Sequence, residues 1–193
     1  RISAYVKLIC EELKKIPRFQ TYLTSENIER IVSAAPLHDL GKIAIPDAIL
    51  CKTTVLTSDE FNLIKQHPLM GDQLIRDNMS SIEDAEYIRI ARDVALHHHE
   101  WWNGNGYPDG LSGRNIPLCA RIISTADVLD ALLSKRPYKD GYTIDKTYEI
   151  ISSLAGIQFD PDIIGILPKI KNEIEEIAND DSGRLAEKYV SLD

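Results

Sequence analysis

The spacing of apolar residues is the feature that most restricts how this chain can fold. At its start, apolar side chains recur every three or four positions, which is the period of an amphipathic helix. They are Ile2, Val6, Ile9, Leu13 and Ile16. No segment shows the sustained alternation of apolar and polar residues that marks a half-buried strand. The sequence therefore predicts an all-α fold, a bundle of seven or more helices. We expect residues 1–193 to form one domain, with residues 168–193 as a C-terminal helical extension.

Capping residues, prolines and glycines divide the rest of the chain into helices. Thr57 with Glu60, and Ser80 with Glu83, have the spacing of capping boxes. The first box leads into FNLIKQHPLMGDQLI and the second into EYIRIARDVALHHHE, so we expect one helix in each. The other expected boundaries are a start near Ser25, a perturbation at Pro36, a first turn at Pro117, an end at Gly156, a cap at Asp160 with Pro161 in the first turn, and a break near Gly183.

Composition and charge limit the kind of protein. The hydrophobic content of 44% and the charged content of 27% are typical of globular proteins. No apolar run approaches the roughly 20 residues that span a bilayer. The net charge of −8 makes the chain a poor partner for DNA or anionic lipid, but it allows a small phosphate ligand held by local cations. The distant cysteines Cys10, Cys51 and Cys119 indicate reduced thiols and a cytoplasmic location.

All five histidines fall in three short segments, each at a predicted helix end or beside a glycine or proline. Imidazole and carboxylate groups are the usual ligands of zinc, iron and manganese, and bridging carboxylates suit a pair of metals. A single histidine is more often a packed or surface residue, so the prediction of a metal site rests on the three segments together. They are LHDLGK with His38, KQHPLMG with His67, and ALHHHE with His97, His98 and His99.

Two carboxylates accompany these histidines. Asp39 follows His38 directly. Asp127 lies beside the apolar stripe of Ile122, Ala126, Leu129 and Leu133. A carboxylate so close to a core face needs a partner, because burying an isolated charge is costly.

An ordered series of motifs resembles the HD-GYP family of cyclic di-GMP phosphodiesterases, a branch of the HD superfamily of metal-dependent phosphohydrolases. The series covers roughly Ser33 to Leu167, in the family's order, so it is far more specific than a single His-Asp dipeptide. Its members are His38-Asp39-Leu40-Gly41-Lys42, His67-Pro68, His98-His99-Glu100, Gly106-Tyr107-Pro108, Ile116-Pro117, Asp127 in ADVLDAL, Arg136-Pro137-Tyr138-Lys139 and Phe159-Asp160-Pro161.

The resemblance implies a role for each matching residue. The implied metal ligands are His38, Asp39, His67, His98, His99 and Asp127, with Asp39 bridging. They would hold two or three divalent transition metals. Iron and manganese are the metals that the resemblance favours over others. Asp39 and Lys42 are the implied catalytic residues. The implied substrate-binding residues are Lys42, Tyr107, Arg136 and Lys139. We interpret His97 as a flanking helix residue and Asp130 as structural.

Two positions depart from the family's pattern. The family carries a Glu and a His on the first helix, upstream of an Arg that corresponds to Arg1, and the chain begins at that Arg. We therefore expect the first helix to be truncated at its N-terminal end, which puts a third metal in doubt. Asn103 stands where many members carry Asp, and we expect it to support a turn equally well.

The function that the resemblance implies is hydrolysis of cyclic di-GMP to linear pGpG, and the sequence leaves open whether pGpG is cut further to GMP. We hypothesise that a hydroxide bridging the metals attacks phosphorus in line and expels a ribose 3′ oxygen. One alternative is a cyclic dinucleotide sensor, or a module that binds a signalling protein through the Gly-Tyr-Pro loop, with little or no turnover. A generic mononucleotide phosphohydrolase is a third reading. The sequence leaves open whether the chain forms a homodimer.

Overall fold

The structure, a computed structural model, describes residues 1–135, 141–180 and 182–190. Within these ranges the chain is helical, and its only β feature is an isolated bridge between Ala155 and Phe159. The α-helices are α1 (Ile2–Lys14), α2 (Pro17–Gln20), α3 (Ser25–Ala34), α4 (Asp47–Leu50), α5 (Ser58–Ile64), α6 (His67–Asn78), α7 (Ala85–His97), α8 (Leu118–Leu133), α9 (Ile144–Ser153), α10 (Pro161–Ile166), α11 (Lys171–Asn179) and α12 (Arg184–Val190). The 3-10 helices are η1 (Ala35–Ala44), η2 (Gly113–Asn115) and η3 (Leu167–Ile170). The predicted all-α fold of seven or more helices is confirmed.

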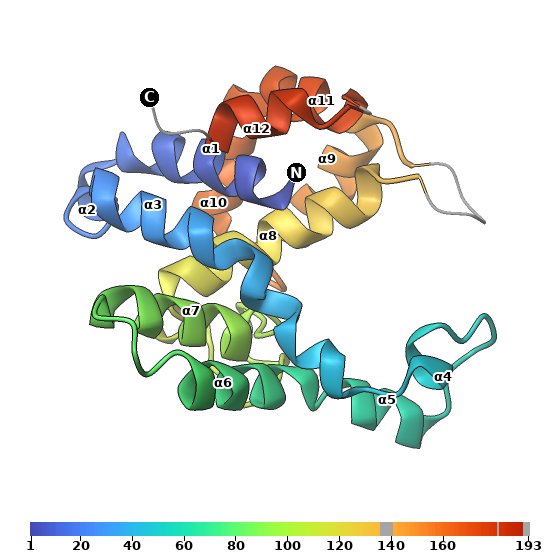
Figure 1. Cartoon of the computed structure of the whole chain (residues 1–193). Coiled ribbons are helices and arrows are strands. Elements are labelled where there is room, and N and C mark those ends of the chain that lie inside the picture. The colour runs from blue at the N-terminus through green and yellow to red at the C-terminus, as the bar shows by residue number, and fades with distance from the viewer. Residues whose placement is uncertain (136–140, 181, 191–193) are drawn as a thin grey trace.

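Helices α1 and α8 form the centre of the core. Tyr5 and Ile9 of α1 and Ile122 and Ile123 of α8 have no solvent-exposed surface. α1 packs against α3, α8 and α12, and Figure 1 shows α6 and α7 below these helices. No helix of the described residues is long and apolar enough to cross a membrane.

The capping box at Thr57 is confirmed, but the length of its helix is not. The Glu60 N–H donates to the Thr57 hydroxyl, and the Thr57 N–H donates to the Glu60 carboxylate. The helix then ends at Ile64, so the prediction of one helix through FNLIKQHPLMGDQLI is wrong. Pro68 explains the break, because proline lacks the N–H that a helix interior needs and instead occupies the first turn of α6. As a result, His67 begins a new helix.

The capping box predicted at Ser80 is wrong. Helix α7 starts at Ala85, and its cap is Asp84, whose carboxylate accepts a hydrogen bond from the Tyr87 N–H. The same carboxylate binds Arg30 of α3, with Nε to Oδ2 at 2.8 Å. Asp84 thus caps α7 and ties it to α3, which Ser80 could not do.

The other predicted boundaries hold to within three residues. Helix α3 starts at Ser25 behind the cap Thr24, and passes into η1 beside Pro36. Pro117 is the residue before α8 rather than its first turn. Helix α9 ends at Ser153, three residues before Gly156, while Asp160 caps α10 as predicted. Gly183, with a φ of 71°, lies between α11 and α12.

The segment from α4 through α5 extends away from the rest of the molecule (Figure 1). We call residues 47–64 the α4–α5 arm. Neither helix of the arm has a buried residue. Val55 is 93% exposed and Phe61 46% exposed. The arm therefore gains little from hydrophobic burial, and it leads directly to Lys65 and His67.

Candidate metal centre

Three packed elements bring the histidine segments together. His38 and Asp39 lie on η1, His67 is the first residue of α6, and His98 and His99 follow at the end of α7. These three elements pack against one another in every pairing. Gly41 permits the approach of η1 to α6, because a Cβ atom at this position would lie 1.9 Å from the His67 carbonyl oxygen. Asp127, the sixth residue expected to bind metal, lies on α8.

The side chains converge on one small volume. Asp39, His67, His98 and His99 each offer a ligand atom, and these atoms all lie within 4.8 Å of one another. We call these four residues the metal cluster. His38 adjoins it, with Nε2 3.4 Å from the Asp39 carboxylate and 3.7 Å from that of Asp127.

Backbone carbonyl groups fix the tautomer of three imidazoles. Nδ1 of His38 lies 2.7 Å from the Ala35 oxygen, and Nδ1 of His67 lies 2.7 Å from the Ile64 oxygen. Nδ1 of His98 lies 3.0 and 3.1 Å from the oxygens of Val94 and Ala95. Because a carbonyl only accepts hydrogen bonds, each Nδ1 carries the proton. When these rings are neutral, Nε2 is left as a free lone pair on the opposite side of the ring.

Burial keeps three of the rings neutral. It lowers the pKa of His67, and together with the neighbouring His99 it lowers the pKa of His98 well below its usual value. Burial, followed by the influence of His67, lowers the pKa of His99 to about 3. Nε2 of His67 lies only 3.2 Å from Nε2 of His98. Two lone pairs facing each other at this distance repel, unless a proton or a cation lies with them.

His38 and Asp39 carry opposite charges. Burial opposes a charge on His38, but its contacts with Asp127 and Asp39 outweigh burial and raise its pKa to about 10. Burial likewise opposes the Asp39 carboxylate, while His38 and Lys42 hold its pKa well below the usual range. The Lys42 ammonium donates to Asp39 at 2.6 Å.

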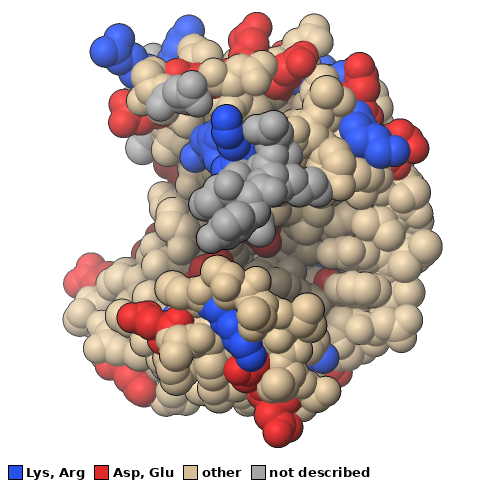
Figure 2. Space-filling model, turned by 90° about the vertical axis from the view of Figure 1, so that its right-hand side faces the viewer, with Lys and Arg blue, Asp and Glu red and all other residues tan. Residues whose placement is uncertain are grey.

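The donor set fits a divalent metal. It combines imidazole nitrogens and carboxylate oxygens, which zinc, iron and manganese accept. Nδ1–H groups bound to carbonyls are the usual outer support of metal-binding histidines. The Asp39 and Asp127 side chains are 34% and 33% exposed, so the cluster opens to solvent. Figure 2 shows the face toward which the arm projects, hollowed between the arm and the upper helices, with acidic atoms visible inside.

The loop after the cluster is held close to it. The Tyr107 ring stacks on His99 with centroids 4.8 Å apart, and Tyr107–Pro108 is a cis peptide bond. Gly106 allows the loop to fold back, because a Cβ there would lie 2.3 Å from the Trp101 nitrogen. Asn103 supports the turn as expected, since its side-chain oxygen accepts from the Asn105 N–H.

Several residues named from the sequence lie elsewhere. His97 faces Asp109 at 3.2 Å, outside the cluster, and Asp130 pairs with Arg1 at 3.0 Å, which agrees with a structural role. Arg136 and Lys139 lie outside the described residues.

Lys65 is a further cation near the cluster that the sequence did not predict. Its ammonium lies 4.9 Å from the Phe61 ring centroid and 5.2 Å from that of Tyr107. The only signal in the sequence was its place two residues before His67.

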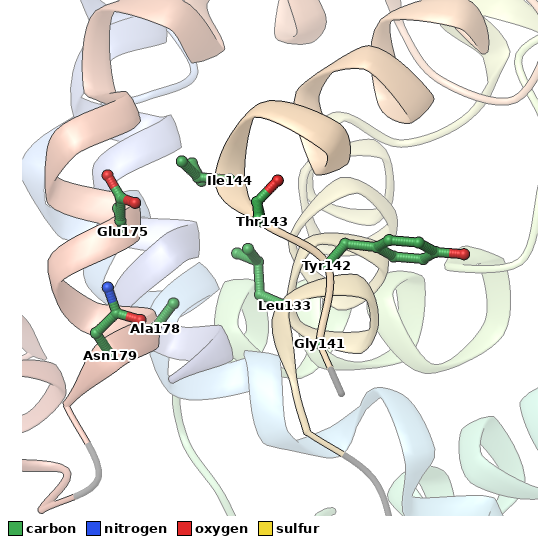
Figure 3. Close-up of a pocket in the computed structure, with 8 residues that line it drawn as sticks. All are labelled: Leu133, Gly141, Tyr142, Thr143, Ile144, Glu175, Ala178 and Asn179. Carbon is green, nitrogen blue, oxygen red and sulfur yellow. The ribbon is translucent and has the colours of Figure 1, made fainter. Parts of the chain in front are cut away.

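A separate cavity of about 310 Å³ lies between α8, α9 and α11 (Figure 3). Glu175 and Asn179 of α11 line one side, and Thr143 and Ile144 at the start of α9 line the other. The metal cluster contributes no residue to it, so this cavity is distinct from the candidate metal centre.

The profile of the HD domain family matches residues 1–163 of the chain. A cyclic di-GMP phosphodiesterase of Vibrio cholerae is 40% identical over 92% of the chain and 36% of its own length. The cyclic di-GMP phosphodiesterase response regulator RpfG of Xanthomonas campestris is 42% identical over 92% of the chain and 43% of its own length. The chain thus spans less than half the length of these relatives.

Solved structures share the fold. A cyclic GMP-AMP specific phosphodiesterase of V. cholerae superposes with a TM-score of 0.66 at 15% identity, covering 99% of this chain and 48% of that one. Bd1817 of Bdellovibrio bacteriovorus, described as an HDG"Y"P protein, gives a TM-score of 0.62 at 21% identity. The match covers 89% of this chain and 51% of that one.

Proposed function

The chain belongs to the HD domain family, and from this membership we propose that it is a metal-dependent phosphodiesterase that hydrolyses cyclic di-GMP to pGpG, with cleavage to GMP as an alternative end point. The relatives named as cyclic di-GMP phosphodiesterases support the substrate. The observation that carries the proposal is the metal cluster, in which Asp39 and three histidine rings converge beside an opening to solvent.

We assign the metal ligands to His38, Asp39, His67, His98, His99 and Asp127, with Asp39 and Asp127 as the carboxylates. They would hold two or three divalent transition metals, of which iron and manganese fit the mixed nitrogen and oxygen donors. When bound, such metals supply an activated water at neutral pH and shield the charge of the phosphate.

The chain's own residues prepare the site for a phosphodiester. The neutral rings of His67, His98 and His99 offer lone pairs without a competing proton. Lys42, 40% exposed and paired with Asp39, places a positive charge beside the cluster, where it can neutralise charge that develops on phosphoryl oxygens. Hydrolysis adds water across one P–O3′ bond, which leaves a 5′-phosphate on one guanosine and a 3′-hydroxyl on the other.

The substrate would enter through the hollow beside the arm. We assign Tyr107 as a contact for a base at the opening, because its half-buried ring stacks on His99 of the cluster. Arg136 and Lys139 remain proposed phosphate or guanine contacts from outside the described residues. The free thiols of Cys10, Cys51 and Cys119 agree with the reducing cytoplasm as the proposed location. A signalling partner at the Gly-Tyr-Pro loop and a homodimer remain alternatives for the assembly.

Elemental analysis combined with a turnover assay tests the proposal. Protein purified without oxygen is expected to contain divalent metal and to convert cyclic di-GMP to pGpG, as measured by chromatography. Treatment with a chelator should abolish turnover, and added manganese or iron should restore it. Bound metal with cyclic di-GMP affinity but no turnover would instead identify a sensor, and hydrolysis of mononucleotides alone would identify a generic phosphohydrolase.

A further inference from the structure

Lys65 is a half-buried cation beside the metal cluster. It follows α5 directly, where its N–H donates to the Phe61 carbonyl at 3.0 Å. Its ammonium contacts the rings of Phe61 and Tyr107, at 4.9 and 5.2 Å. Tyr107 in turn stacks on His99, so a single aromatic ring separates the ammonium from a cluster residue.

Within the described residues no carboxylate forms an ion pair with this ammonium. Lys42 differs, because Asp39 binds it at 2.6 Å. Lys52 of the arm differs too, because Glu60 binds it at 2.6 Å. Aromatic faces attract a cation more weakly than a carboxylate does, and they leave its charge available to an anion.

A cyclic dinucleotide carries two phosphodiester anions in one ring. Only one of them is cleaved at the metal cluster in a given turnover, and the other must lie nearby, because the ring joins them. From the position and unpaired charge of Lys65 we infer that it binds the second, non-reacting phosphodiester. This inference rests on the proposed function and adds a substrate-binding residue to it. Contacts with the rings of Phe61 and Tyr107 hold the ammonium in place.

Steady-state kinetics of Lys65→Gln and Lys65→Arg, with Lys52→Gln as the matched control, test the inference. We expect Lys65→Gln to raise KM for cyclic di-GMP roughly tenfold, the effect of losing one charged hydrogen bond. Lys65→Arg keeps the charge and should restore most of the affinity. Lys52→Gln removes a lysine from the adjoining α4–α5 arm and should change KM less than twofold.

Two further measurements separate substrate binding from a merely structural role. Bis(p-nitrophenyl) phosphate has only one phosphodiester, so Lys65→Gln should impair its hydrolysis several-fold less than that of cyclic di-GMP. The KM of the wild type should rise with salt more steeply than that of Lys65→Gln, because an ion pair with the substrate is screened.

Three results would overturn the inference. The first is an unchanged KM for cyclic di-GMP in Lys65→Gln, measured against an active wild type. The second is an equal loss on both substrates, which would mean that Lys65 only supports Tyr107. The third is an equal effect of Lys52→Gln. A wild type with metal but no cyclic di-GMP hydrolysis would refute the proposed function itself, and the role of Lys65 with it.

Discussion

The three consecutive histidines at positions 97–99 have three different environments. His97 faces Asp109 near the surface, the His98 side chain is 1% exposed, and His99 stacks on Tyr107. Neighbouring residues at a helix end point in different directions, so the triplet could not act as one unit. The family motif indicated that His98 and His99, and not His97, are the metal ligands. The spacing of the histidines alone did not distinguish them.

Replacing each histidine separately tests this division. We expect His98→Ala to reduce metal affinity and the rate of cyclic di-GMP turnover by about a hundredfold or more. Even changes to residues that only support a metal ligand reduce metal affinity or activity about 10–100-fold. His97→Ala is the matched control and should retain most of both. Metal content by elemental analysis and the initial rate are the measurements, and equal losses in the two variants would contradict the assignment.

The charge on His38 predicts a proton release. Burial opposes this charge, but Asp127 and Asp39 raise the pKa of His38 to about 10, so the metal-free protein carries the proton at pH 7. Metal binding through Nε2 must displace it, whereas His67, His98 and His99 are already neutral. Calorimetry of chelator-treated protein in buffers of different ionisation enthalpy should show release of about one proton, and affinity that increases from pH 7 to 9. Release of three or more protons would contradict these pKa shifts.

Among the elements, 3-10 helix η1 depends most on close packing. A Cβ at Gly41 would lie 1.9 Å from the His67 oxygen and 2.6 Å from the Gly71 nitrogen, both of which are backbone atoms. We expect Gly41→Ala to destabilise the fold by at least about 2 kcal/mol and to separate Asp39 from His67.

Gly165→Ala is the control for this change. Gly165 is an exposed residue of α10, and a Cβ there meets no atom within 4 Å, so the variant should be stabilised by about 0.5–1 kcal/mol. Denaturant unfolding measures both values. A Gly41→Ala protein as stable as the wild type would show that η1 and α6 can separate freely.

Sequence signals located elements better than they located the contacts between them. The box at Thr57 was found because both of its hydrogen bonds are local. The start of α7 was missed because Asp84 also binds Arg30, which is distant in the sequence. Pro68 was visible, yet its effect depended on the chain turning between α5 and α6 to deliver His67 to the cluster.

At the scale of the whole molecule, stability is unevenly distributed. The core lies around α1 and α8, whereas α4 and α5 have no buried residue. We expect backbone amides of the α4–α5 arm to exchange with deuterium roughly a hundredfold or more faster than those of α8, because opening the arm exposes little apolar surface. Mass spectrometry of peptides from each region measures the rates, and equal protection would show that the arm is part of the core.

The fold class followed from helical periodicity and the cluster from the ordered motifs. Both signals can be read directly from the order of residues along the chain. Lys65 could not be predicted in this way. Its significance depends on Tyr107 reaching back to His99 and on the absence of a carboxylate in the described surroundings. The residues next to position 65 in the sequence reveal neither feature.

The carbonyl groups that orient His38, His67 and His98 belong to residues only three or four positions earlier in the chain. The hydrogen bond that orients each ring is thus made inside a stretch of about one helical turn. The orientation of these rings therefore depends on local sequence more than on the segments that connect the three elements. Such a centre should tolerate sequence drift in the connecting segments far better than drift within those short stretches.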